Sequence, residues 1–213
     1  MLLPLCSFSL HLDISHNRLA NDVKDFTLSE SPRNYHHRTV TNTYLQPNAS
    51  YPPAFARAVA LLLGDEGGYS HDPADAGGET NFGICKREYP DTDIKSLTRE
   101  DAIAIYFRDW WRRYCYSDLP GPIGAKVFGL AVNMGPEHAA RCLQRALRAC
   151  GRPVTEDAVV GASTRAAAAA ANQLALMAAL RSEAAAYYRL VAANQNHERA
   201  AAFLNGRLNR AYE

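Results

Sequence analysis

Candidate catalytic side chains are concentrated between positions 61 and 84, in the stretch LLLGDEGGYSHDPADAGGETNFGI. A run of leucines leads two acidic residues, Asp65 and Glu66, into a glycine-rich loop that carries two more aspartates, a threonine and an asparagine. Hydrolysis of a glycosidic bond requires a shielded acid, a solvated carboxylate and a hydroxyl or amide able to hold water. This stretch contains each of those parts.

Glu66 is the better candidate for the acid. Four apolar residues before it repeat at the spacing of one helical face: Phe55, Val59, Leu62 and Leu63. We expect that helix to run into Gly67–Gly68, with Glu66 continuing its apolar stripe. Partial desolvation and the negative end of the helix dipole would both raise the pKa of Glu66, which suits an acid near neutral pH. Asp65 points about 100° away on the same helix, toward solvent.

The loop that follows supplies partners for this acid. Its turn-forming Asp-Pro and Gly-Gly pairs predict that it folds back beside the helix end as a turn or a small β-hairpin. That return would bring Asp72 or Asp75, and Thr80 or Asn81, toward Glu66. The same residue types are common in loops without a catalytic role, and Asp72 and Thr80 could be simple caps.

A metal site is the alternative use of these acidic groups. Asp72, Asp75 and Glu79 offer oxygen ligands of the kind that calcium prefers. The twelve-residue calcium loop, with its central glycine and closing glutamate, is absent from the sequence. The sequence therefore predicts no metal and no cofactor.

Helices must position this loop, because helical periodicity dominates the rest of the chain. Thr98 can cap a helix through SLTREDAIAIYFRDWWRRY, whose predicted buried residues are Ile103, Tyr106, Phe107 and Trp110. Further helices are expected over 123–134, from Pro136 to a stop at Gly151, across RAAAAAANQLALMAALRSEAAAYYRLVAANQ, and over 198–211. Alternating patterns are short, so any sheet is a small hairpin. The predicted fold class is mainly α.

The bulk properties are those of a globular protein with one main domain. The chain has 213 residues, of which 47% are hydrophobic and 21% charged. A net charge of +1 demands neither a nucleic acid nor an acidic membrane as partner. No apolar run approaches the length of a membrane span. Five cysteines without a C-x-x-C pair suggest reduced thiols in a reducing cytoplasm.

Residues 1–52 differ from the rest of the chain. They are rich in Ser, Thr, Asn and His, show weak apolar periodicity, and end in the proline-rich TYLQPNASYPP. We interpret them as an irregular arm or a mis-assigned start, with the domain opening near Ala54. The first residues lack a basic group before their apolar run and a clear cleavage site, so no export signal is expected.

Four strings together resemble the glycoside hydrolase family 108 endolysins, which are phage-type N-acetylmuramidases: DEGGYSHDPADAGGETNFGI, SLTREDAIAIYFRDWW, VFGLAVNMGPEHAARCLQRAL and FLNGRLNRAYE. The usual neighbour in that family is a predicted peptidoglycan-binding domain, and DAVVGASTRAAAAA resembles its D-G-x-x-G-x-x-T element. The resemblance implies a lysozyme-like catalytic region over 53–150 and a helical peptidoglycan-binding-like region over 151–213, packed on it. The implied reaction cleaves the β-1,4 bond between N-acetylmuramic acid and N-acetylglucosamine.

The resemblance also implies roles for single residues. Glu66, the glutamate of E-G-G-Y, would be the general acid. Asp75 and Thr80 lie at offsets where other phage-type lysozymes place an aspartate and a threonine, and Asp72 is the rival. The aspartate would activate or orient a water or stabilise charge, and Thr80 would help to position that water. We favour inversion at the anomeric centre, because a hydroxyl-held water fits poorly with a covalent nucleophile.

Sugar binding should use aromatic faces and amides along a groove. The predicted substrate-binding residues are Tyr69, Asn81, Phe82, Trp111 and Asn133. The neighbouring Trp110 lies on the predicted buried stripe, so we assign it to the core.

The chain departs from the family pattern at several positions. Trp110-Trp111 replaces a Tyr-Trp pair, and Gly129 stands where an aspartate is common. Arg207 replaces a tryptophan near the C-terminal end, which puts packing or a sugar-stacking wall in question. Ala158 replaces the glycine of D-G-x-x-G and weakens the interpretation of a wall-binding element. The acid and its loop are intact.

Two other functions stay open. A lytic transglycosylase uses a lone glutamate, so Asp75 and Thr80 would be dispensable. A non-catalytic peptidoglycan-binding or secretion-assisting module would need none of Glu66, Asp75 and Thr80 for catalysis. The expected partner is the peptidoglycan glycan strand, with no nucleic acid and no stable membrane insertion, and the expected state is a monomer. We expect synthesis in the bacterial cytoplasm, in a phage or prophage-like setting, and action on the wall after release or secretion.

Overall fold

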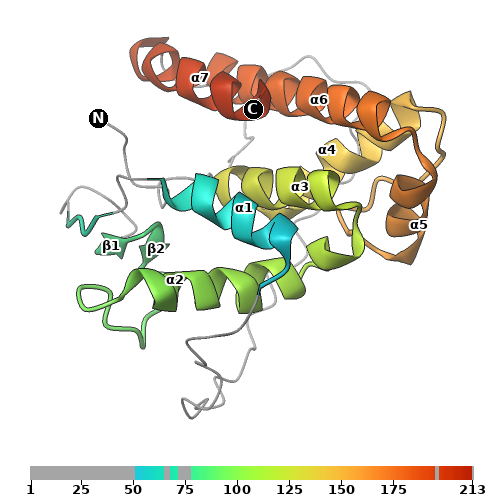
Figure 1. Ribbon diagram of the computed structural model, residues 1–213. Coiled ribbons are helices and arrows are strands. Elements are labelled where there is room, and N and C mark those ends of the chain that lie inside the picture. Colours follow the sequence, from blue (N-terminus) through green and yellow to red (C-terminus); the bar gives the residue numbers. More distant parts are fainter. Residues whose placement is uncertain (1–50, 65–67, 72–77, 195–196, 213) are drawn as a thin grey trace. The chain divides into compact units, whose positions relative to one another are not determined.

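The computed structural model describes residues 51–64, 68–71, 78–194 and 197–212, the last stretch by its backbone alone as far as residue 203 (Figure 1). Its helices are α1 (Pro53–Leu63), α2 (Arg99–Ile105), α3 (Gly121–Met134), α4 (Pro136–Ala149), α5 (Ala162–Ala170), α6 (Gln173–Ala193) and α7 (His197–Tyr212). A π-helical segment, Tyr106–Arg112, continues α2, and a 3-10 turn, Tyr116–Asp118, leads into α3. Strands β1 (Thr80–Asn81) and β2 (Ile84–Cys85) form a small antiparallel hairpin. The predicted mainly α class is confirmed.

Local chemistry explains where several helices begin. Thr98 caps α2 as predicted, because its Oγ1 accepts the Asp101 N–H at 3.1 Å while Asp101 Oδ2 accepts the Thr98 N–H at 3.2 Å. This reciprocal pair satisfies two backbone donors that the first turn leaves open. The alanine-rich stretch forms two helices rather than one. Asn172 starts the second of them, since its Oδ1 accepts the Ala175 N–H at 3.0 Å.

The π-helical segment changes which tryptophan faces the core. A π-helix has a wider turn than an α-helix, so it rotates every later side chain relative to the predicted stripe. Trp111 is therefore buried, with 2% of its surface exposed, whereas Trp110 is half-buried against the edge of the core. The predicted burial of Tyr106 is confirmed, and Phe107 is half-buried.

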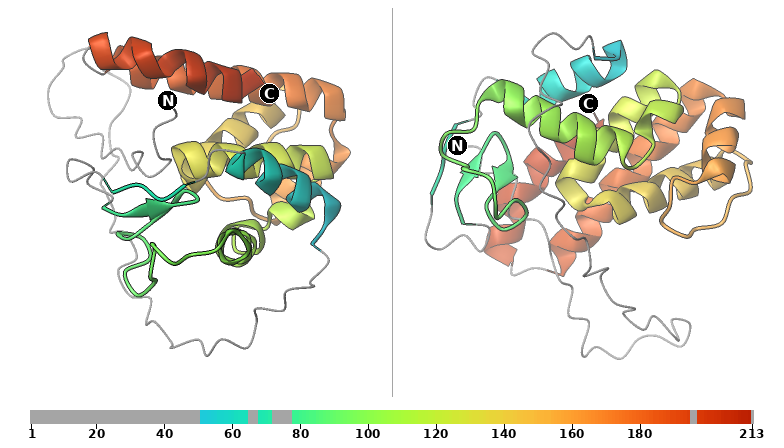
Figure 2. Two further views of the ribbon diagram at one scale, coloured as in Figure 1. Left: turned by 60° about the vertical axis from the view of Figure 1, so that its left-hand side comes forward. Right: turned by 90° about the horizontal axis from the view of Figure 1, so that it is seen from below.

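The helices pack in a chain of neighbours. Helix α3 contacts α1 on one side and α4 on the other, α4 contacts α6, and α7 returns along α6 (Figures 1 and 2). Close approach at the start of α3 depends on Gly124, because a β-carbon there would collide with the carbonyl oxygen of Tyr116. Phe55 of α1, Trp111 and Phe128 of α3 form the aromatic centre of the core, with ring centroids 5.5 to 5.8 Å apart.

Candidate active site

The end of α1 leads directly to the predicted acid. The helix ends at Leu63, where Gly64 adopts φ 47° and ψ −161°, a conformation that glycine reaches without steric cost. The predicted continuation of this helix to Gly67–Gly68 is therefore wrong, and the helix-dipole argument for a raised pKa at Glu66 loses its basis. Glu66 itself, with Asp65, lies outside the described residues.

Arg99 holds the chain just before the predicted acid. Its Nη1 donates a hydrogen bond of 3.2 Å to the carbonyl oxygen of Gly64. Arg99 is the first residue of α2, and the capping box of Thr98 fixes that end of the helix. The segment that leads to Glu66 is thus tied to a helix that starts 35 residues later in the sequence.

The other flank of Glu66 is tied to β1. Ser70 and Thr80 pair as an antiparallel bridge, with N–H to carbonyl distances of 2.8 and 2.9 Å in the two directions. Beside this bridge the Tyr69 hydroxyl donates to Glu79 Oε1 at 2.9 Å, and this bond raises the pKa of Tyr69, so the hydroxyl stays protonated. The predicted fold-back of the loop is confirmed at its base.

The loop closed by this bridge carries both candidate aspartates. Asp72 and Asp75 lie outside the described residues, so their predicted roles stay predictions. Among the residues that the structure describes, His, Cys, Asp and Glu side chains form no group of three that could hold a metal ion.

Thr80 and Asn81 are both buried but differ in their hydrogen bonding. Asn81 Nδ2 donates to the carbonyl oxygens of Ile94 at 3.1 Å and Leu97 at 3.2 Å, which holds the segment before α2 against the hairpin. Thr80 is 2% exposed, and its Oγ1 has no hydrogen-bond partner within the described part of the chain. A buried hydroxyl without a protein partner commonly binds water or a ligand.

Phe82 sits in the two-residue turn of the hairpin with an unusual backbone. Phe82 has φ 50° and Gly83 has φ 78°, the pair of positive values that such a tight turn requires. A phenylalanine in this region is strained. The Tyr106 hydroxyl holds it there by donating to the Phe82 carbonyl oxygen at 3.2 Å. Its ring is half-buried against the core.

The other predicted sugar contacts differ in exposure. Tyr69 is 41% exposed. Trp111 is surrounded by Phe55, Tyr116 and Phe128, so no face of its ring is open to a sugar in this structure. Asn133 is half-buried, and its Nδ2 donates back along α3 to the Gly129 carbonyl at 2.8 Å.

Sequence reasoning missed the residues that tie the site together. Arg99 and Tyr106 act over 35 and 24 residues of sequence, so the string SLTREDAIAIYFRDWW that contains them does not show their partners. The sequence predicts Glu79 only as a possible metal ligand, whereas its Oε1 accepts the Tyr69 hydroxyl. The position of Glu79 beside Thr80 in a returning loop indicates such a contact, because residues at the base of a hairpin lie close to the opposite strand.

Comparison with known proteins shows which families and which solved structure the chain resembles. Residues 59–135 match the family model for Glycosyl hydrolase 108, and residues 138–212 match the model described as a Predicted Peptidoglycan domain. No curated protein matches the chain. Among solved structures, SagA of Brucella abortus is similar, with 25% sequence identity and a TM-score of 0.55 over 75% of this chain and 96% of that one.

These findings support the class of the protein, a mainly helical glycoside hydrolase. Its region 59–135 is similar to the glycosyl hydrolase 108 family, and its region 138–212 is similar to a predicted peptidoglycan domain, as the motifs had indicated. Peptidoglycan is therefore the supported partner. No helix in the described ranges has the length and apolar character that a membrane crossing needs.

Proposed function

We propose that the protein is an N-acetylmuramidase that cleaves the β-1,4 bond between N-acetylmuramic acid and N-acetylglucosamine, with Glu66 as the general acid. The observation that carries this proposal is the glycosyl hydrolase 108 match over 59–135, which includes the E-G-G-Y string, followed directly by a peptidoglycan domain. The anchoring of both flanks of Glu66, by Arg99 at Gly64 and by Thr80 at Ser70, supports it. An acid must be held within hydrogen-bond reach of the oxygen that it protonates.

The remaining parts of the proposed reaction come from the loop and from β1. Glu66 protonates the glycosidic oxygen, while Asp75, or Asp72 in its place, activates or orients a water on the opposite face of the sugar. Thr80 helps to hold that water through its buried Oγ1, which has no other partner in the described ranges. Inversion of the anomeric centre follows from attack by this water. Tyr69 is the exposed aromatic residue beside the anchored loop and is placed to contact the sugar.

Digestion of purified peptidoglycan sacculi tests the proposal. Glu66→Gln keeps the shape of the side chain but removes the proton, so turnover should fall by about 10²-fold or more. Glu88→Gln is the matched control, because Glu88 is an exposed glutamate outside the proposed machinery. Unchanged turnover in Glu66→Gln at an unchanged unfolding temperature would overturn the role of Glu66, whereas absence of turnover in the folded parent protein would favour a non-catalytic wall-binding module.

The products separate hydrolysis from the transglycosylase reaction. Mass spectrometry should find reducing muramic acid ends, since water is the attacking group. A 1,6-anhydro end would show that the sugar's own hydroxyl attacks. Asp75→Asn, Asp72→Asn and Thr80→Val identify the water-handling residues, and Thr80→Ser should keep most of the activity because it keeps the hydroxyl. Equal turnover of all four variants and the parent protein would exclude a held water.

Anchoring by Arg99 can be tested on the same substrate. Arg99→Gln removes the bond to the Gly64 carbonyl while leaving the capping box in place. Turnover should fall with little change in unfolding temperature, since the half-exposed side chain contributes little to the core.

We further propose that the protein is made in the cytoplasm of a phage- or prophage-bearing bacterium and acts as a monomer on the wall after release or secretion. Cell fractionation during lysis, with light scattering of the purified chain, tests both statements. A processed N terminus in the extracellular fraction would contradict release from the cytoplasm without a signal.

A further inference from the structure

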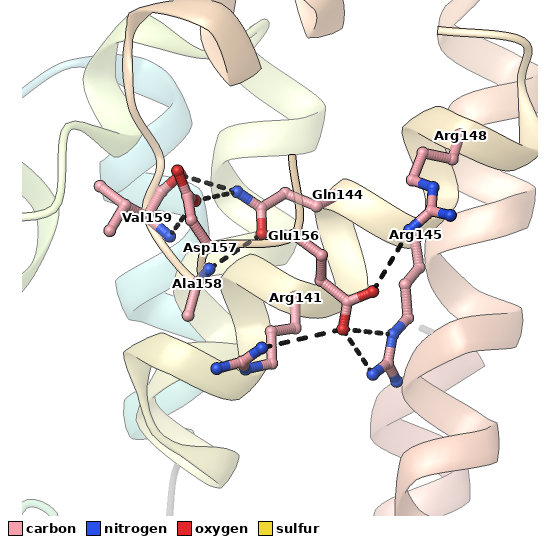
Figure 3. A network of polar contacts seen from close by, with 8 residues as sticks. All are labelled: Arg141, Gln144, Arg145, Arg148, Glu156, Asp157, Ala158 and Val159. Atoms are coloured by element: carbon pink, nitrogen blue, oxygen red, sulfur yellow. Dashed lines mark hydrogen bonds and ion pairs between the residues drawn. The ribbon is translucent and has the colours of Figure 1, made fainter. Parts of the chain in front are cut away.

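The segment after α4 returns along that helix and is held there by a buried glutamine (Figure 3). Gln144 is 0% exposed, and its Nε2 donates to Asp157 Oδ1 at 2.6 Å and to the Val159 carbonyl at 3.0 Å. Its Oε1 accepts the N–H of Ala158 at 3.0 Å. Both ends of one amide thus bind consecutive residues of the segment, and this clamp, which includes the Asp157 carboxylate, fixes its position.

Three arginines stand beside this clamp on one face of α4. Arg141, Arg145 and Arg148 occupy positions i, i+4 and i+7, and all three reach the carboxylate of Glu156 (Figure 3). Arg145 is closest, with Nη2 2.6 Å and Nε 2.9 Å from Oε1. Arg141 and Arg148 lie at 3.8 and 3.6 Å. We call these three residues the arginine face.

The arginine face offers exposed hydrogen-bond donors. Its three guanidinium groups share the Glu156 carboxylate, and the side chains of Arg145 and Arg148 are 46% and 57% exposed. Asp157 and Glu183 add negative potential at Arg141 and Arg145. The Asp157 carboxylate keeps its charge, but its Oδ1 is engaged by Gln144 and by the Val159 N–H at 2.9 Å.

A purely structural role does not account for three arginines. Ion pairs at an exposed surface add little to stability, because water and salt screen them and long side chains lose entropy. The segment already has its buried clamp, and a single pair with Arg145 would suffice to orient Glu156. Guanidinium groups have a planar set of donors that matches a carboxylate, and Glu156 shows that such a group fits here.

We propose that the arginine face binds the free carboxylates of the peptide stems of peptidoglycan. This inference rests on the proposed action on peptidoglycan and adds to it the chemistry by which the C-terminal region recognises the wall. Arg148 and Arg145 meet the incoming carboxylate, and Glu156 is an internal competitor for the same donors. The face would hold the enzyme on its polymer while the strand is cut elsewhere on the molecule.

Binding to insoluble sacculi, measured by co-sedimentation, tests the proposal. The protein carries Glu66→Gln throughout, so that binding is read apart from cleavage. Replacing Arg141, Arg145 and Arg148 together by Gln should weaken binding about tenfold, and added salt should weaken the parent protein in the same direction. Glu156→Gln should strengthen binding about twofold to fivefold, because it removes the competing charge.

Controls separate charge from folding and from other anions. Arg189→Gln, an exposed arginine of α6, removes one charge outside the arginine face and should leave binding unchanged. The triple Lys variant keeps the charge and should retain much of the binding. Should the triple Gln variant fail to fold, Arg148→Gln alone should weaken binding about twofold. Sacculi whose carboxylates have been converted to methylamides should bind the parent protein about as weakly as native sacculi bind the triple Gln variant.

Several outcomes would overturn the proposal. They are unchanged binding in the folded triple Gln variant, weaker binding in Glu156→Gln, or binding that survives methylamidation but disappears when wall teichoic phosphates are removed. Failure of the proposed function gives a different result, which is retained turnover in Glu66→Gln while the arginine face still governs binding.

Discussion

The two matched regions of this chain have hydrophobic cores of different composition. In region 59–135 and the start of α1, aromatic rings form the core, with Phe55, Trp111 and Phe128 in mutual contact. In region 138–212 the buried residues are mostly leucine and alanine, among them Leu143, Leu147, Leu176, Leu180, Ala184 and Ala185. Small residues let α4, α6 and α7 approach closely, whereas large rings fill the space between short, differently oriented segments.

The difference suits what each region has to hold in place. In region 59–135 the candidate catalytic residues follow α1, and the aromatic core gives the described residues that flank them fixed anchoring points such as the Tyr106 hydroxyl at Phe82. In the second region a regular helix, α4, presents the arginine face directly. There the irregular segment after α4 is held by one polar side chain, Gln144, and Val160 of the same segment packs in the core.

The largest expected effect comes from breaking the aromatic core. Trp111→Ala should lower the free energy of unfolding by about 3–5 kcal/mol, because it leaves a large cavity among rings that cannot collapse. Trp111→Phe should cost less and should leave the KM for sacculi fragments unchanged, since the ring is 2% exposed. Denaturant unfolding and steady-state kinetics measure the two effects. A raised KM in the folded Phe variant would restore the predicted sugar contact at Trp111.

Removing the polar clamp should cost less but remain clear. Gln144→Leu keeps the volume, leaves the Ala158 N–H without its partner and removes one donor each from the Asp157 carboxylate and the Val159 carbonyl, so the free energy of unfolding should fall by about 2–3 kcal/mol. Gln173→Leu is the matched control in the same region. Its Nε2 donates to two carbonyl oxygens at 2.8 and 2.9 Å but its side chain is only half-buried. Equal losses in the two variants would contradict the special role of Gln144.

Regular periodicity made much of the fold predictable. The apolar spacing in α3 and α4, the Thr98 cap and the final helix could be predicted because each depends on residues within a few positions of one another. The end of α1 could not be predicted, because a single glycine inside LLLGDE does not by itself indicate a positive φ. The π-helical turn after Ile105 likewise shifted burial from Trp110 to Trp111, and no local motif marks such a turn.

The candidate site was predictable in its composition but not in its supports. The E-G-G-Y string and the loop after it predicted glycoside hydrolysis. The base of that loop pairs as predicted, at Ser70 and Thr80. The bonds from Arg99 to Gly64 and from Asn81 to Ile94 join residues that the fold alone brings together. The spacing of the three arginines is visible in RCLQRALR. Their shared partner, Glu156, is not, because it depends on the return of the segment after α4.

The smallest expected effects concern the backbone of the segment after α4. Two residues with positive φ lie within this segment. Gly151 has φ 71° and Ala158 has φ 65°. Gly151→Ala should lower the free energy of unfolding by about 1 kcal/mol, and the cost is conformational because no atom beyond the adjoining residues lies within 4 Å of the added β-carbon. Ala158→Gly should raise it by about 0.5 kcal/mol, since relief of that strain exceeds the entropy that glycine adds to the unfolded chain. Denaturant unfolding of both variants decides the point. If Ala158→Gly destabilises the protein, the half-buried methyl group of Ala158 contributes more by packing than its backbone costs, and packing as well as the clamp holds this segment.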